Sequence, residues 1–102
     1  MKKGVLSDMT WCEVAELKDD VKIAVIPVGS TEQHGPHLPL RHDAASVLYV
    51  AEKVAEVLYP KVLVTPVMQF GVSYHHMNFP GTISIRPETL TNLLLDICES
   101  LV

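Results

Sequence analysis

The chain has 102 residues, of which 48% are hydrophobic and 20% are charged, and its formal net charge at pH 7 is −4. This length allows one small domain, and the composition is that of a folded protein rather than a disordered one. The net acidity and the lack of a basic stripe argue against a nucleic-acid partner. No apolar run approaches the length of a membrane span, so we expect no membrane partner either.

A short helix is the first element that the sequence predicts. Thr10 and Glu13 have the spacing of a capping box, in which two side chains satisfy free amides at a helix start. The helix is expected to end near Leu17. It would carry Cys12, which lies far from Cys98 and matches no metal-binding or redox spacing. We expect both cysteines to be small core residues of a cytoplasmic protein that has no signal peptide.

A strand, a helix and a second strand follow, which predicts a βαβ unit. Residues 23–28 (IAVIPV) and 61–67 (KVLVTPV) are continuous apolar runs, typical of parallel strands buried on both faces. Residues 44–58 have a helical period between them. We expect the two strands to be adjacent and parallel, with the helix packed across them. The apolar stripe of that helix comprises Val47, Leu48, Ala51, Val54, Val57 and Leu58.

The second half begins with a long loop over residues 68–80, and residues 81–85 (GTISI) then predict a short strand. Pro87 and Glu88 suit the first turn of a further helix, because proline is tolerated there and glutamate complements the helix dipole. We expect this helix to turn a set of apolar side chains toward a core: Leu90, Leu93, Leu94, Ile97 and Leu101.

The last predicted helix reaches Val102 without a stop signal. Strands as apolar as these also need more cover than two or three helices supply. We therefore expect residues 1–102 to be the N-terminal part of a longer, mainly parallel α/β domain, here incomplete. The alternative is a small domain that completes its sheet by self-association. These 102 residues leave apolar surface that they cannot cover themselves, so we also expect a homo-oligomer, or further polypeptide that fills that space.

The loop after the first strand concentrates metal-ligand side chains. Glu32 and His34 are two residues apart, so in an extended segment they point the same way. Asp43 lies just before the predicted helix, where free amides can orient a carboxylate. Pro36 and Pro39 restrict the backbone that connects His34 to Asp43. Ligands of open α/β sheets bind beyond the carboxyl ends of strands, which is where this loop lies.

Carboxylates and imidazole together suit Zn²⁺, Mn²⁺ or Fe²⁺ and do not choose among them. Three protein ligands would leave room for water, which a metal ion can convert to a nucleophile near neutral pH. The alternative is a solvated polar turn in which Asp43 is an ordinary helix cap. His37 and His42 are weaker candidates, either as hydrogen-bonding neighbours of the site or as plain loop histidines.

Two stretches resemble the creatininase (creatinine amidohydrolase) family. Residues 27–43 (PVGSTEQHGPHLPLRHD) are similar to its N-terminal metal-binding motif, and residues 70–85 (FGVSYHHMNFPGTISI) to its second block. The resemblance implies a creatininase-like α/β fold with a mainly parallel sheet, a two-metal centre and ring-like homo-hexamers. It also implies that Glu32 binds one metal ion, His34 the other, and Asp43 both.

The second block implies substrate-binding roles for Ser73 and His76, which without the family would be interpreted as turn and surface residues. The family's remaining ligands, a His and a Glu near a Gly-rich segment, have no match in this chain. The resemblance therefore implies about half of a two-metal site, with weak metal affinity. No residue of the chain is assigned a catalytic role.

The leading hypothesis is a metal-dependent amidohydrolase that cleaves a C–N bond of a small-molecule amide, such as a cyclic amide or a formamide. A metal-activated water would attack the amide carbon, and the metal ions would hold the developing oxyanion. The alternative is a non-catalytic fragment or assembly module that keeps only the fold, or a half-site completed by another chain. The substrate and the metal stay open.

Overall fold

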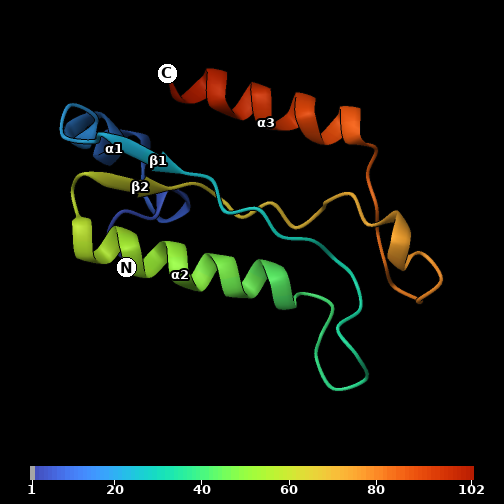
Figure 1. Cartoon of the computed structure of the whole chain (residues 1–102). Helices are drawn as coiled ribbons and strands as arrows, with labels where there is room; N and C mark the ends of the chain where they lie inside the picture. Colours follow the sequence, from blue (N-terminus) through green and yellow to red (C-terminus); the bar gives the residue numbers. More distant parts are fainter. Residues whose placement is uncertain (1) are drawn as a thin grey trace. The chain divides into compact units, whose positions relative to one another are not determined.

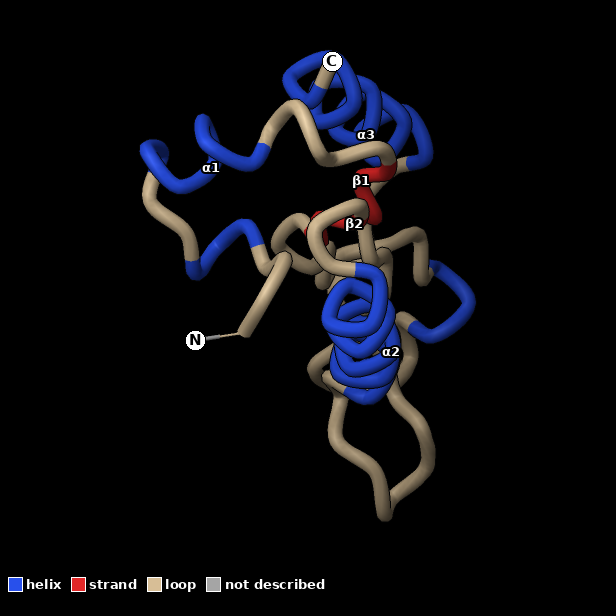
Figure 2. The backbone as a smooth tube through the Cα atoms, turned by 90° about the vertical axis from the view of Figure 1, so that its left-hand side faces the viewer, coloured by secondary structure: helices blue, strands red, loops and turns tan. Residues whose placement is uncertain are grey.

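The computed structural model describes residues 2–102, which divide into two compact units. Unit 1 contains the chain up to Pro27 together with Ser46–Val67, and unit 2 contains Val28–Ala45 and Met68–Val102. Figure 1 labels the helices and strands, and Figure 2 shows the two short strands in red. In chain order the elements are η1 (Leu6–Asp8), α1 (Trp11–Leu17), β1 (Ile23–Val25), α2 (His42–Leu58), β2 (Val62–Val64), η2 (Tyr74–His76) and α3 (Pro87–Leu101).

The two predicted strands pair in parallel in unit 1, as expected. Ala24 of β1 lies opposite Leu63 of β2, and the regular ladder covers three residues of each strand. Both strands are shorter than the apolar runs that predict them. Their parallel pairing, with α2 between them in sequence, confirms the expected βαβ arrangement and the α/β fold class.

The core of unit 1 lies between α2 and β2. Ala51 and Ala55 of the helix pack against Val62 and Val64 of the strand, with Leu48 and Val25 partly buried beside them. Alanine at these positions lets the helix approach the strand closely, since no larger side chain separates the two backbones. The predicted apolar stripe is therefore partly wrong: it missed Ala55, which is fully buried, and included Val57, which is 78% exposed.

Burial differs between the two strands, which corrects the expectation for the first. All three residues of β2 are buried, whereas Ile23 of β1 is 56% exposed. Val5 makes a parallel bridge to Val64 on the other side of β2, and the Val64 amide donates to the Gly4 carbonyl. The second strand is thus flanked on both sides, and the first is an edge strand within the described residues.

The helix starts follow the predicted signals. Thr10 and Glu13 form a capping box: the threonine hydroxyl accepts from the Glu13 amide at 3.2 Å, and the Glu13 carboxylate accepts from the Thr10 amide at 3.3 Å. Pro87 is in the first turn of α3. The second helix begins at His42, two residues earlier than predicted, so Asp43 lies inside its first turn rather than before it.

Two burial predictions are wrong. The structure describes all of α3 and fully buries none of its residues: of the expected apolar face, Leu90, Leu94 and Ile97 are half-buried, and Leu93 and Leu101 are exposed. Cys12 and Cys98 are free and exposed rather than core residues. Cys12 belongs to a helix in which Leu17 is the one buried residue, and Cys98 lies on α3. No helix in residues 2–102 is long and apolar enough to cross a membrane.

Unit 2 is held together by bridges between extended segments. Val28 pairs with Met68, Thr31 with Ile83, and Gly71 with Ser84. These are isolated bridges, so the short strand expected over residues 81–85 does not form a regular ladder. The bridges nevertheless fix the start of the loop that contains Glu32 against both later segments.

Candidate metal centre

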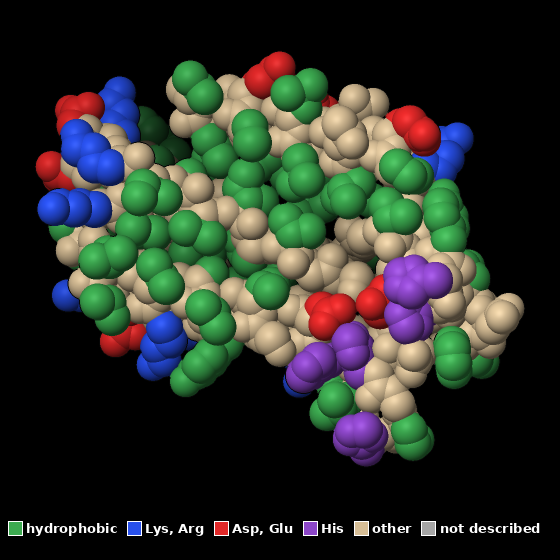
Figure 3. All heavy atoms as spheres, in the orientation of Figure 1, with side chains coloured by type: hydrophobic (Ala, Val, Ile, Leu, Met, Phe, Trp, Pro, Cys, Tyr) green, Lys and Arg blue, Asp and Glu red, His purple; other side chains and the backbone are tan. Residues whose placement is uncertain are grey.

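Glu32, His34 and Asp43 come together within unit 2. Each offers one ligand atom, and the three atoms all lie within 4.8 Å of one another. On the face of the molecule drawn in Figure 3, histidine side chains (purple) lie beside acidic side chains (red). The i, i+2 spacing and the return of the chain to Asp43 therefore produce the expected convergence. That these residues hold a metal ion stays a prediction.

The Asp43 carboxylate is positioned by the loop rather than by the free amides of a helix end. The Ser30 hydroxyl donates a hydrogen bond of 2.7 Å to Oδ2 of Asp43. Gly29 makes this approach possible, because a Cβ there would lie 2.6 Å from the backbone N and Cα of Ala44. The Ser30 hydrogen bond lowers the pKa of Asp43 below its usual range, and the neighbouring imidazole of His34 adds to the effect. The carboxylate is therefore ionised at neutral pH, as a metal ligand must be.

The His34 imidazole has a buried nitrogen without a hydrogen bond. Its Nε2 lies 3.1 Å from Oδ2 of Asp43, but the two atoms are not aligned as a hydrogen bond, and no other residue in 2–102 bonds to it. The ring packs against that of His42, with centroids 4.9 Å apart. The Nε2 of His34 is therefore close to the Asp43 carboxylate without an aligned hydrogen bond in residues 2–102, an arrangement that a cation bound by both groups would fit.

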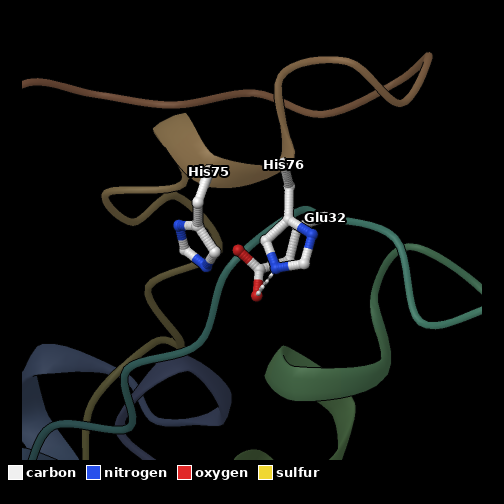
Figure 4. A group of neighbouring side chains, drawn as sticks. All are labelled: Glu32, His75 and His76. Carbon is white, nitrogen blue, oxygen red and sulfur yellow. Dashed lines mark ion pairs between the residues drawn. The ribbon is translucent and has the colours of Figure 1, made fainter.

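A second group shares Glu32 with two histidines of η2. Ligand atoms of Glu32, His75 and His76 also lie within 4.8 Å of one another. Figure 4 shows both rings beside the carboxylate, with His76 Nε2 3.6 Å from Oε1 of Glu32. The sequence did not lead us to expect His75 as a possible metal ligand, and it led us to expect His76 near the substrate. The pair of adjacent histidines was visible in the sequence. It does not show, however, that these residues lie close to the loop that contains Glu32.

The two predicted substrate-binding residues have different surroundings. Ser73 is fully buried: its amide donates to Ser84 Oγ at 2.8 Å, and its own hydroxyl has no partner within residues 2–102. His76 is partly buried and lies beside Glu32 and Gln33. The substrate-binding role of both stays a prediction, and His76 is placed next to the candidate metal ligands.

The donor set fits a divalent cation of intermediate hardness. Two carboxylates and an imidazole suit Zn²⁺, Mn²⁺ or Fe²⁺, and the closeness of the three ligand atoms suits one ion or two neighbouring ions. Of the weaker candidates, His42 packs its ring at a tilt against that of His34, and His37 is exposed. Neither belongs to a group of possible ligands in the described part of the chain.

Comparison with known proteins is consistent with this geometry. The creatinine amidohydrolase family model matches residues 7–102. The chain is 45% identical over 104 residues to the mycofactocin precursor peptide peptidase of Mycobacterium tuberculosis H37Rv, covering 94% of this chain and 41% of that protein. It is 33% identical over 108 residues to the creatinine amidohydrolase of Pseudomonas putida (99% and 41%) and 34% identical over 90 residues to the 3-dehydro-scyllo-inosose hydrolase of Thermotoga maritima (87% and 28%).

Solved structures give the same result. A creatinine amidohydrolase crystal structure superposes with a TM-score of 0.87 at 33% identity, over 99% of this chain and 40% of that one. A Zn-Zn form of an E122Q creatininase mutant is also similar, with a TM-score of 0.87 at 32% identity over 99% of this chain and 41% of that one. A Mn creatininase has a TM-score of 0.85 at 34% identity, over 98% of this chain and 40% of that one. The chain spans less than half the length of the relatives it matches.

Proposed function

Because this chain belongs to the creatininase family, we propose that its protein is a metal-dependent hydrolase that cleaves a C–N amide bond of a small molecule. The observation that carries the proposal is the convergence of the Glu32, His34 and Asp43 ligand atoms in one group. Two residues of the loop after β1 and one residue of α2 meet there, and the buried Nε2 of His34 lies 3.1 Å from Oδ2 of Asp43. The similarity to structures of Zn and Mn creatininases supports a divalent ion at this place.

Each of the three residues has a distinct role in this proposal. Glu32 and His34 would each bind one ion, and Asp43 would bind both. A divalent ion bound there lowers the pKa of water and polarises a carbonyl oxygen. The chain's own part is to present ionised carboxylates in a fixed geometry. Ser30 contributes to this by holding Asp43 in place and keeping its pKa low.

For the substrate, we propose only a broad chemical class and no single compound. Relatives are named for a precursor peptide, for creatinine and for an inosose, so the names do not agree on one compound. Two of these names describe cleavage of a peptide or an amide, which favours a C–N bond. Ser73 and His76 are proposed to contact the substrate, since His76 lies beside the candidate metal ligand Glu32.

A hydrolysis assay tests the proposal. The protein, loaded with Zn²⁺ or Mn²⁺, is incubated with creatinine, an N-formyl amine and a short peptide, and release of amine or carboxylate is measured. We expect turnover of at least one amide by the wild type and none by Asp43→Asn, which keeps the side-chain volume but removes the charge. Metal binding without turnover of any amide would instead favour a non-catalytic assembly module.

A further inference from the structure

The His76 ring is held at both its backbone and its side chain. Its amide donates to the Ser73 carbonyl at 2.9 Å, and its carbonyl accepts from the Thr82 hydroxyl at 2.9 Å. Its Nδ1 lies 3.1 Å from the Gln33 side-chain nitrogen, and its Nε2 lies 3.6 Å from Oε1 of Glu32. The ring therefore stands between an amide and a carboxylate, with one nitrogen facing each.

The orientation of the Gln33 amide is fixed independently of the histidine. Its Oε1 accepts a hydrogen bond of 2.8 Å from the Gly35 amide. Gly35 has a φ of 78°, a left-handed conformation that turns the backbone N–H back toward the side chain two residues earlier. A carboxamide that accepts with its oxygen can only donate with its nitrogen, so the NH₂ group faces His76.

This orientation determines the tautomer of His76. A ring nitrogen that receives a hydrogen bond from an NH₂ group must carry a lone pair, so Nδ1 is the bare nitrogen. In the neutral ring the proton is then on Nε2, the nitrogen that faces Glu32. An N–H facing a carboxylate attracts it electrostatically, whereas a lone pair in that place would repel it.

We propose that His76 is a positioning residue for Glu32, locked in the Nε2–H form by Gln33, and not a metal ligand itself. At 3.6 Å the contact is too long for a hydrogen bond, so the Nε2 proton acts on one carboxylate oxygen of Glu32 by electrostatic attraction and leaves the other oxygen free for an ion. The part of this inference that concerns metal affinity rests on the proposed function. The tautomer does not, because it follows from the hydrogen bonds from Gly35 to Gln33 and from Gln33 to His76.

The inference also separates the two possible ligand groups that share Glu32. If Glu32, His75 and His76 held an ion, His76 would need a lone pair on the nitrogen that faces Glu32 and would lose its bond from Gln33. His75, in contrast, is exposed, and its ring packs against that of His76 in a tilted arrangement with centroids 4.1 Å apart. The hydrogen bonding of Gln33 therefore favours Glu32, His34 and Asp43 as the group that binds an ion.

Nitrogen NMR of ¹⁵N-histidine-labelled protein tests the tautomer directly. Spectra are recorded without metal near pH 8, above the ordinary histidine pKa of about 6.5, and the His76 signals are assigned by their loss in His76→Gln. We expect a protonated Nε2 and a bare Nδ1. Gln33→Glu replaces the donating NH₂ with an accepting oxygen, so we expect Nδ1 to become protonated in that variant. A protonated Nδ1 in the wild type, or no change in Gln33→Glu, would overturn the proposal.

Zn²⁺ titration of His76→Gln and His75→Gln separates positioning from ligation. Loss of a neighbour that orients a metal ligand weakens metal affinity about tenfold or more. We expect that loss in His76→Gln and unchanged affinity in His75→Gln. Equal losses in both variants would identify a histidine ligand pair, and no loss in either would show that Glu32 needs no support. Both results contradict the proposal. If the wild type binds no ion, the proposed function fails, and the NMR result still decides the tautomer.

Discussion

Ser30 donates a hydrogen bond of 2.7 Å to the carboxylate of Asp43, a residue thirteen positions later in the chain. The bond links the loop after β1 to the first turn of α2, and it is the largest cause of the lowered pKa of Asp43. One hydroxyl thus both orients the Asp43 carboxylate and lowers its pKa.

Ser30→Ala is expected to raise the pKa of Asp43 toward its usual value of 3.8. A carboxyl whose pKa is lowered by folding stabilises the fold above its unfolded pKa, and that stability is lost as the pH falls through the lower folded pKa. At neutral pH the variant should therefore have a lower free energy of unfolding than the wild type. This free energy should also fall less steeply as the pH is lowered through the range in which Asp43 titrates. Carboxyl NMR titration of metal-free protein measures the pKa, and urea unfolding at several pH values measures the stability. Ser100→Ala, which removes an exposed hydroxyl of α3, is the control and should change neither.

Gly29→Ala should displace the start of α2 from the loop. The new Cβ would lie 2.6 Å from Ala44 backbone atoms, and overpacking of this kind costs about 1–3 kcal/mol. We expect lower stability together with weaker metal binding, because Asp43 precedes Ala44. Gly71→Ala is a matched control, since its nearest contact is 3.2 Å, to the Gly29 carbonyl oxygen. A Gly29→Ala protein as stable as the Gly71→Ala protein would contradict the close approach seen here.

Ser73→Ala and Ser84→Ala should differ although they remove the same group. The Ser73 hydroxyl has no partner among residues 2–102, so its loss should leave the free energy of unfolding nearly unchanged or slightly raised. Ser84 accepts from the Ser73 amide, and its loss leaves that amide unsatisfied at a cost of about 1–3 kcal/mol. Urea unfolding compares the two variants. If Ser73 contacts substrate, Ser73→Ala should also raise KM without loss of stability.

Self-association also stays a prediction, and the exposed apolar side chains of α2 give it a test. Tyr49, Val50 and Val57 are more than 60% exposed and line one hollow of the surface together with Val54 and Leu58. Apolar patches of this kind commonly mark contacts between proteins. Sedimentation equilibrium should show an oligomer for the wild type and a shift toward monomer for Val57→Lys. A wild type that is monomeric at all concentrations would contradict the expectation.

The candidate site could be predicted from the sequence where short-range geometry determines it. Glu32 and His34 share a side because they are two residues apart, and Asp43 falls at a helix start that periodicity identifies. The contacts that adjust the site were not predictable. Ser30 and Gln33 make bonds over 13 and 43 residues, and their polar side chains carry no periodic signal.

The fold shows the same division between local and long-range information. Capping at Thr10 and the two strand segments follow from local chemistry and apolar runs. Burial depends on which neighbours surround a segment, and an apolar run does not identify them. Ile23 is exposed because β1 is an edge strand in the described chain, and Cys12 and Cys98 are exposed because their helices bury few residues or none.

The central claim is that Glu32, His34 and Asp43 form one divalent-metal site. Calorimetric titration of Zn²⁺ or Mn²⁺ into the wild type, Glu32→Ala and Asp43→Ala tests it most directly. We expect weak but measurable binding by the wild type, reduced binding by Glu32→Ala, and no binding by Asp43→Ala, which lacks the ligand proposed to be shared by both ions. Equal binding by the wild type and Asp43→Ala would contradict the claim.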